Sequence, residues 1–448
     1  MADTSKRVVR TFDATSMVAG NIIGSGIFLL SGYAAAPVTD GTWLILAWIG
    51  GGVMAMLGAL SIAELSTTFP DIGGDFLYLN NAYGRYPAFL YGWMSLVIFE
   101  TGSIAILAVF GGKYLLEFFP QSGLSEPFLA SLLVIGISLL HCLRITVGAR
   151  FQSILTVIKI GGLFILTFLL FKSGSGYVES GSANLVDASP MRGFSRALIP
   201  IFFAYTGWNV AGYIAGEVHN PRKTLPRALI GGTLIAMILY IVVEIAFLKS
   251  IGLDAMRGEE MVPVMALKTV GAEGWSFFLT LLIFVSVVSS LSITIQTAGA
   301  RVIQAMGEHG VFFRFTARRH PRFGTPVNAL ILQASWCIVL MYALDIESLV
   351  DSTTVVMILF SSVSISTLLK VRGRSTADGN SGSYRTPLFP LVPVAYIACA
   401  LFVSWGVIRF HLEKGSFLPA WGFAFLAIGS VVFWIWQRSD GGKSENED

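Results

Sequence analysis

Long stretches without charge are the feature that most constrains what this chain can fold into. A helix of about 20 apolar residues crosses the hydrocarbon core of a bilayer, and we identify twelve segments of this kind. They are residues 15–36, 42–63, 87–112, 126–143, 150–171, 194–217, 228–248, 275–300, 327–345, 348–369, 388–409 and 417–436. Backbone N–H and C=O groups cannot remain unpaired in lipid, and the runs are continuously apolar, which favours helices over barrel strands. The sequence therefore predicts an all-α integral membrane protein with twelve transmembrane helices.

Composition narrows the classes of function. Hydrophobic residues make up 54% of the 448 residues and charged residues 13%, about half of the charged fraction of a soluble domain. The net charge of +3 is small and says little about nucleic acid, which is not expected as a partner, and no phosphate-binding loop for ATP is present. Cys142, Cys337 and Cys399 have no paired spacing, so neither a disulfide framework nor a metal site is expected. No cofactor is expected, and without a constellation of catalytic acids or histidines the chain is not expected to be an enzyme.

Lysine and arginine indicate the orientation. If the N-terminus is cytoplasmic, the tails and loops on that side hold about two thirds of the 30 lysines and arginines, which is the positive-inside pattern. They gather at residues 144–150, 222–227 and 314–322. Both termini are therefore predicted to be cytoplasmic, and the chain is expected to be a multi-pass protein of the cell (inner) membrane.

Two of the predicted spans contain residues that interrupt a helix. The first span carries Gly24-Ser25-Gly26 at mid-membrane, and each glycine weakens a helix by about 1 kcal/mol relative to alanine. On this segment alone, close helix packing through small residues is an equal alternative. The sixth span carries Thr206-Gly207 between aromatic residues at a similar depth. Interrupted segments at matching places in two inverted halves indicate the substrate site of a transporter.

The spacing of the two interrupted spans predicts the domain organisation. They stand five spans apart, and a repeat of five spans is odd-numbered, so its second copy enters the membrane from the opposite side. The predicted parts are a cytoplasmic tail at 1–14, a first five-helix repeat at 15–172, a second at 194–370, helices 11 and 12 at 388–436, and a cytoplasmic tail at 437–448.

A broken helix at mid-membrane can hold both ends of a zwitterion without a charged side chain. Free N–H groups at the start of its second half attract a carboxylate, and free C=O groups at the end of its first half accept hydrogen bonds from an ammonium group. The candidate donors are the amides of Ser25, Gly26 and Ile27, together with the Ser25 hydroxyl. The candidate acceptors are the carbonyls of Ile22, Phe203 and Thr206.

Ionisable residues inside the predicted spans are candidates for function. Lys159 lies about ten residues from either end of its span, which is too deep for its charge to reach the interface easily. Glu100 in the third span is compatible with a passive protonated residue, with proton coupling or with contact to a cationic substrate. Glu244 is expected near the outer interface, and Glu217 is expected to orient the basic loop at 222–227.

The motifs resemble those of the amino acid–polyamine–organocation superfamily, and within it the L-type amino acid transporter branch and its bacterial relatives. The resemblance covers spans 1 to 10. The residues that carry it are Gly20-Asn21-Ile22-Ile23-Gly24-Ser25-Gly26-Ile27-Phe28, Phe69-Pro70, Gly73-Gly74, Tyr78, Gln152, Leu155-Thr156, Lys159, Phe203-Ala204-Tyr205, Gly207-Trp208-Asn209, Glu217, Asn220-Pro221 and Leu225-Pro226-Arg227.

The resemblance implies a LeuT-like five-plus-five inverted-repeat fold, alternating access and an α-amino acid substrate. It also implies that Phe203 closes over the substrate from the outside, and that Ser103 and Thr206 line the side-chain pocket. By the same resemblance, Lys159 takes the place of a sodium ion between spans 1 and 8. Its expected partners are Ser289 or Ser290 and the carbonyl of Ala19 or Gly20. Sodium-independent transport is therefore expected.

Two departures from the family pattern refine these expectations. Thr206 stands where many relatives have glycine, which narrows the pocket or adds a hydroxyl contact. The loop 117–127 has no cysteine, so a disulfide-linked heavy chain is not expected. The leading prediction is a secondary carrier for neutral L-amino acids, working by exchange or with protons. The alternatives are a cationic amino acid or polyamine exchanger, favoured by Glu100, and a membrane sensor that does not transport.

Overall fold

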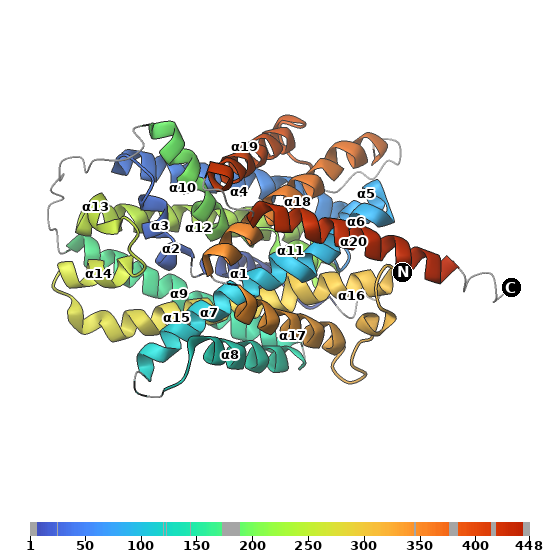
Figure 1. The fold of residues 1–448 in the computed structure, drawn as a ribbon, viewed down its shortest axis with the longest axis horizontal. Coiled ribbons are helices and arrows are strands. Elements are labelled where there is room, and N and C mark those ends of the chain that lie inside the picture. Colours follow the sequence, from blue (N-terminus) through green and yellow to red (C-terminus); the bar gives the residue numbers. More distant parts are fainter. Residues whose placement is uncertain are drawn as a thin grey trace.

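The chain forms one bundle of helices (Figure 1). The computed structural model describes residues 7–24, 26–119, 121, 123–143, 145–172, 189–344, 346–375, 384–413 and 418–441. Among these residues the only β-pairings are two isolated bridges, Val9 with Val218 and Ile72 with Ile214. The all-helical expectation therefore holds for the described part of the chain.

The first half contains the following elements: α1 (Thr11–Ile22), α2 (Gly26–Leu29), α3 (Ser31–Ala35), α4 (Gly41–Thr68), α5 (Asp75–Tyr83), α6 (Arg85–Met94), the π-helix η2 (Ser95–Phe99), α7 (Glu100–Phe118), α8 (Glu126–His141) and α9 (Ile145–Lys172).

The second half continues with α10 (Pro190–Ala204), α11 (Val210–Tyr213), η3 (Ala215–Glu217), α12 (Pro221–Ile251), α13 (Leu253–Met256), α14 (Val262–Thr269), η4 (Glu273–Trp275), α15 (Ser276–Thr294), the π-helix η5 (Ile295–Gly299), α16 (Ala300–Glu308), η6 (Arg314–Ala317), α17 (Val327–Ala343), α18 (Ile346–Ser375), α19 (Leu391–Glu413) and α20 (Leu418–Gly441).

Eight helical stretches of the described residues are long and apolar enough to cross a membrane. They are Thr11–Leu29, Gly41–Thr68, Arg85–Phe118, Gln152–Lys172, Pro221–Ile251, Glu273–Glu308, Ser352–Arg372 and Leu391–Arg409. Helices α8 and α17 and the stretch Gly422–Gln437 are shorter, and the segment expected at 194–217 is divided by a break. Each of the twelve predicted segments thus overlaps helical residues, whereas the number of membrane crossings stays a prediction.

The sequence patterns did not predict the short helices between the spans. Helix α5 follows α4 directly, and α13 and α14 follow α12. In Figure 1, α3, α13 and α14 lie at the left-hand end of the bundle, and α5, α16 and the end of α20 lie at the right-hand end. Outer residues of α8, α9, α19 and α20 expose large apolar side chains, as surfaces that face lipid do.

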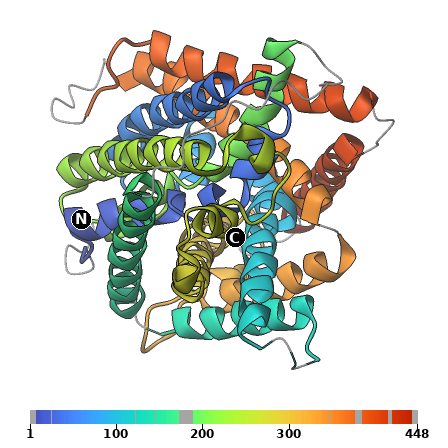
Figure 2. The ribbon, with the colours of Figure 1, turned by 90° about the vertical axis from the view of Figure 1, so that its left-hand side faces the viewer.

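The centre of the bundle is formed by the elements that carry the sequence motifs. Helix α1 packs against α9, α12 and α15, and α10 packs against α4. Figure 2 shows α15 between α7 and α9, and α15 packs against both of these helices. The two interrupted segments are therefore surrounded by helices on all sides, and their polar backbone groups need partners within the protein.

Candidate functional site

The first helix break lies where the sequence predicted it. Helix α1 ends at Ile22 and α2 begins at Gly26, with Ile23 and Gly24 outside both helices. The predicted donor Ser25 lies outside the described residues. A side chain at Gly26 would place its Cβ 2.6 Å from the Ala204 Cα atom, so only glycine lets the two broken segments approach this closely.

Neighbouring helices donate hydrogen bonds to the carbonyls around the first break. The Lys159 ammonium from α9 donates to the Gly20 carbonyl at 2.5 Å. The Ser286 hydroxyl from α15 donates to the Gly24 carbonyl at 3.0 Å, and the Ser290 hydroxyl lies 3.3 Å from the Gly20 carbonyl. The Tyr240 hydroxyl from α12 donates to the carbonyl of Ile22. Three separate helices therefore hold this break in place.

The second break, between α10 and α11, is held mainly by its own residues. Helix α10 ends at Ala204, and residues 205–209 form turns before α11 begins at Val210. The Thr206 hydroxyl and amide both donate to the Phe203 carbonyl, at 2.7 and 3.0 Å. Gly207 has a φ of +92°, which favours glycine. A Cβ atom here would lie 2.2 Å from Nδ2, the side-chain amide nitrogen of Asn21. The turn and the first break are thus in direct contact.

A cavity opens where the two breaks meet. The predicted site residues that line it are Ile22, Gly26, Glu100, Ser103, Phe203, Thr206, Gly207 and Ser290. Further lining residues that the sequence did not single out include Asn21, Asp75, Tyr91, Asn209, Tyr213, Thr294, Met357 and Ser361. Ile27, Lys159 and Ser289 are buried outside the cavity lining. The substrate contact predicted for Ile27 therefore stays a prediction, since the residue does not line the cavity.

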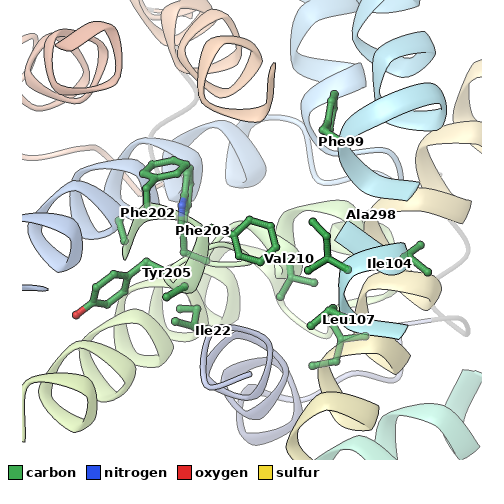
Figure 3. Packing of buried hydrophobic residues seen from close by; sticks show 14 of the residues in the cluster. Ile22, Phe99, Ile104, Leu107, Phe202, Phe203, Tyr205, Val210 and Ala298 are labelled. Carbon is green, nitrogen blue, oxygen red and sulfur yellow. The ribbon is translucent and has the colours of Figure 1, made fainter. Parts of the chain in front are cut away.

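Phe203 occupies the apolar side of this cavity. Figure 3 shows its ring pointing toward Val210, with Leu107 and Ala298 beyond, whereas the Tyr205 side chain points the other way. Phe203 is 6% exposed. It immediately precedes the last residue of α10, so its position depends on the conformation of the break.

Lys159 lies behind the first break. Its side chain is 1% exposed, and besides the Gly20 carbonyl it lies 3.4 Å from the Ser290 hydroxyl and 3.4 Å from the Ser286 carbonyl. Ser289 faces elsewhere and accepts a hydrogen bond of 2.6 Å from the Gln152 side chain. Of the two serines that the sequence offered, Ser290 is the one beside Lys159.

A polar cluster closes the end of the cavity beside α5. The Asp75 carboxylate accepts hydrogen bonds from Tyr213 at 2.6 Å, Asn209 at 3.1 Å and Tyr91 at 3.3 Å. Burial raises the pKa of the Asp75 carboxyl above its usual value, and the hydrogen bond from Tyr213 acts in the opposite direction. No sequence pattern singled out Asp75 as a site residue, although the Gly73-Gly74 motif lies directly before it.

Glu100 lines the cavity without a polar partner. Its side chain is 8% exposed, and the described residues offer it no hydrogen bond or ion pair. It begins α7 directly after the π-helical stretch η2, and stands three residues before Ser103. A buried carboxyl group that faces a cavity is available to a ligand or to a proton.

One expectation about acidic residues was wrong, and another is supported in part. Glu217 has a structural role: its carboxylate pairs with Arg301 of α16 at 2.8 Å, joining η3 to the extension of α15, whereas its orientation of the basic loop stays a prediction. Glu244 is not interfacial: it is 0% exposed and lies 2.8 Å from the Ser31 hydroxyl. Both residues lie at the ends of apolar segments, where sequence alone does not show which face of the helix is covered.

Comparison with known proteins places the chain among transporters. The family model described as amino acid permease matches residues 9–434. The serine/threonine exchanger SteT of Bacillus subtilis (strain 168) is 28% identical over 404 residues, which cover 89% of this chain and 90% of SteT. The b(0,+)-type amino acid transporter 1 of Mus musculus is 26% identical over 420 residues, covering 92% and 83% of the two chains. The cystine/glutamate transporter of Homo sapiens is 26% identical over 447 residues, covering 97% and 86%.

These matches bear on the expectations from the sequence. The resemblance to amino acid–polyamine–organocation transporters is confirmed, and so is the expectation that the chain is not an enzyme. The family match extends over nearly the whole chain and includes both helix breaks and the cavity between them. The chain is therefore a member of the amino acid permease family of membrane transporters.

Proposed function

We propose that this chain is a sodium-independent exchanger of neutral L-amino acids that works by alternating access in the cell (inner) membrane. In this proposal the twelve helical segments span the bilayer with both termini cytoplasmic, and the fold is the LeuT-like inverted repeat with two added C-terminal helices. Broken spans 1 and 6 stand five spans apart, and so do spans 3 and 8, which contain the π-helices η2 and η5. These pairs support the repeat.

The observation that carries the proposal is the contact between the two helix breaks at one cavity. The amides of Gly26 and Ile27 lie in the first turn of α2, where helix geometry leaves N–H groups without an intrahelical acceptor. The carbonyls of Ile22 and Phe203 lie on the other side of the breaks. The amides carry partial positive charges that suit an α-carboxylate, and the carbonyls carry partial negative charges that suit an α-ammonium group. The substrate is therefore an α-amino acid held by its backbone.

Lys159 supports independence from sodium. Its ammonium group stands between α1 and α15 and donates to the Gly20 carbonyl, where a bound cation would need carbonyl and hydroxyl oxygens. A fixed positive charge at this position repels a second cation. The lysine thus stabilises the first break without an ion from solution.

The side-chain end of the cavity supports a small neutral substrate. It is lined by hydroxyl groups of Ser103, Thr206 and Thr294 and by the apolar Leu107 and Met357. Exchange rather than net uptake is supported by SteT, whose name describes it as a serine/threonine exchanger. Glu100, without a partner in the same cavity, favours a second candidate, the exchange of cationic amino acids.

Counterflow in proteoliposomes tests the proposal. Vesicles loaded with unlabelled amino acid and diluted into labelled alanine, serine, leucine, methionine, arginine or putrescine should accumulate labelled serine or alanine first. Accumulation should be equal in sodium and choline buffers. Arginine as the preferred substrate would select the cationic alternative, and complete loss of counterflow without sodium would contradict the role given to Lys159.

A further inference from the structure

A second buried carboxyl group lies on the outer half of α12, away from the cavity lining. Glu244 is 0% exposed, and its nearest polar neighbours are the Ser31 hydroxyl of α3 and the indole of Trp48. One carboxyl oxygen, Oε1, has no hydrogen-bond partner, and neither has the Trp48 indole nitrogen or the Tyr205 hydroxyl. The carboxyl group therefore lies in a closed aromatic environment, with the Ser31 hydroxyl bound to it and the Trp48 indole beside it.

The hydrogen atoms at this site can be counted. The Ser31 oxygen lies 2.7 Å from the Ile27 carbonyl and 2.8 Å from Oε2 of Glu244. A serine hydroxyl has one hydrogen, so it can donate to only one of these two oxygens. A protonated Glu244 supplies the second hydrogen: the carboxyl donates to Ser31, and Ser31 donates to Ile27. Protonation of Glu244 thus lets both contacts of the Ser31 oxygen be hydrogen bonds at the same time.

The charge around Glu244 leads to the same protonation state. The titratable groups that face it are Tyr205, which follows α10, and Tyr240, on α12 itself. Trp48 of α4 and Ser31 of α3 do not titrate. The described charged side chains on α12 and on the elements that pack against it are exposed or bonded elsewhere: Asp13, Glu64, Lys159, Lys172, Glu217, Arg222, Lys223, Arg227, Lys249, Asp254 and Lys268. An ionised carboxylate here would be buried without a cation, which is strongly unfavourable.

The position of Glu244 connects it to the substrate site. Tyr240 stands four residues earlier on the same face of α12, and its hydroxyl donates to the Ile22 carbonyl and lies 3.2 Å from the Ala204 carbonyl. Ser31 belongs to the short helix α3 that continues the outer half of the broken first span. One face of α12 thus holds both the breaks and the segment that leads from the first break to the outside.

We propose that Glu244 is a proton-binding site that fixes the outer half of the first span, α2 and α3, against α12. The proton bridges the carboxyl group and Ser31 while this segment is closed. When α3 moves away, water reaches the carboxyl group, the O–H bond breaks and the proton passes to that water. Deprotonation therefore favours the opening of the outer side of the carrier. The inference rests on the proposed alternating access and adds the proton as a second ligand.

The test is the pH dependence of serine counterflow with wild-type protein and Glu244→Gln. The amide keeps the shape and a hydrogen for Ser31 but cannot ionise. Wild-type exchange should rise with external pH, by up to about tenfold per pH unit where opening limits the rate. Glu244→Gln should match the wild type at acidic pH, which shows that it is folded, and should lack the rise at alkaline pH.

Three further variants locate the effect. Ser31→Ala removes the bridging oxygen and should raise the rate of exchange at acidic pH, because the closed form loses the hydrogen bond between α3 and Glu244. Glu273→Gln removes an exposed acid on η4, outside the cavity lining, and serves as the control that should keep the slope of the pH profile. Glu100→Gln tests the other buried acid, which lines the cavity. A flat profile for Glu100→Gln with a normal profile for Glu244→Gln would overturn the inference.

The outcomes separate this inference from the proposed function. Serine counterflow with the same pH profile in wild type and Glu244→Gln would overturn the proton site and leave the transport proposal standing. Absence of counterflow for every amino acid tested, in wild-type protein that binds none of them, would overturn the transport proposal itself.

Discussion

The two helix breaks lie in contact, yet they are held in different ways. The break after Ile22 receives hydrogen bonds from Lys159, Ser286 and Tyr240, which belong to three other helices. The break after Ala204 is capped by Thr206, one of its own residues. The geometry of the first break therefore depends on where α9, α12 and α15 lie, whereas the second has a local cap besides its contacts with Tyr240 and Asp75.

This difference teaches which break can respond to movement. A shift of α15 or α12 relative to α1 removes donors from the first break, and each lost bond costs about 1 kcal/mol, or about 1.5–3 kcal/mol where the donor is charged. The same shift leaves the hydrogen bonds of Thr206 intact. We therefore expect the first break to be the part that rearranges during transport, and the second to move as a unit.

The contact between the breaks gives the largest expected effect. Replacing Gly26 by leucine forces atoms into the Ala204 backbone, so we expect counterflow to fall to background, at least about a hundredfold, because a misplacement of about 1 Å at the site already has effects of that size. Gly161→Leu is the matched control, since nothing lies within 4 Å of a Cβ at this position on α9. Normal serine affinity in Gly26→Leu would contradict the proposed site.

Removal of Lys159 tests the tertiary support of the first break. Lys159→Met keeps the length of the side chain but removes a charged hydrogen bond, and exchange should fall by about tenfold to a hundredfold, corresponding to 1.5–3 kcal/mol. Sodium should not restore it. Lys172→Met, at the exposed end of the same helix, should behave like wild type. If the two variants were equally active, the first break would not need this donor.

Tyr240 joins the two breaks, and its loss should have an intermediate effect. Tyr240→Phe removes the hydroxyl that contacts the carbonyls of Ile22 and Ala204 and keeps the ring against Trp48. A neutral hydrogen bond contributes about 1 kcal/mol, so a roughly fivefold fall in the rate of exchange is expected. Single-turnover uptake should place the loss in reorientation, with serine bound no more weakly than by the wild type, because the Ile22 carbonyl is then free for the substrate.

The locally capped break should be the least sensitive. Thr206→Ala removes the hydroxyl that bonds to Phe203 but leaves the backbone hydrogen bond of the same turn. We expect the rate with serine to fall by about threefold or less, since only one partly buried hydrogen bond is lost. Leucine should become a better substrate because the pocket widens. A larger fall in the rate of exchange for Thr206→Ala than for Lys159→Met would mean that the second break, and not the first, is the more sensitive of the two.

The sequence predicted the helix breaks because glycine and polar residues at mid-membrane have a local physical meaning. Gly24, Gly26 and Gly207 are needed at these positions for close approach or positive φ, and both reasons act on the residue itself. The segments that contain them were located within a few residues, because the apolar runs are long and end in charged loops.

What the sequence could not supply was the rotation of each helix. Ser289 and Ser290 are neighbours, and only the packing of α15 shows that Ser290 faces Lys159. Tyr240 is one of 13 tyrosines in the chain, and it lies in an apolar span. Its hydrogen bond to Ile22 joins residues that are 218 positions apart. Glu244 was misplaced for the same reason, since a carboxyl group near a helix end can face either lipid or protein.

The Tyr240 hydroxyl also has a thermodynamic consequence for an unoccupied carrier. Because it already satisfies the carbonyl that an incoming ammonium would use, substrate binding replaces one donor by another and creates few new hydrogen bonds. The enthalpy of binding measured by calorimetry should then be small, and release on the far side correspondingly easy. A carrier releases its substrate in every cycle, so such a substitute donor raises the turnover rate and lowers the affinity for the substrate.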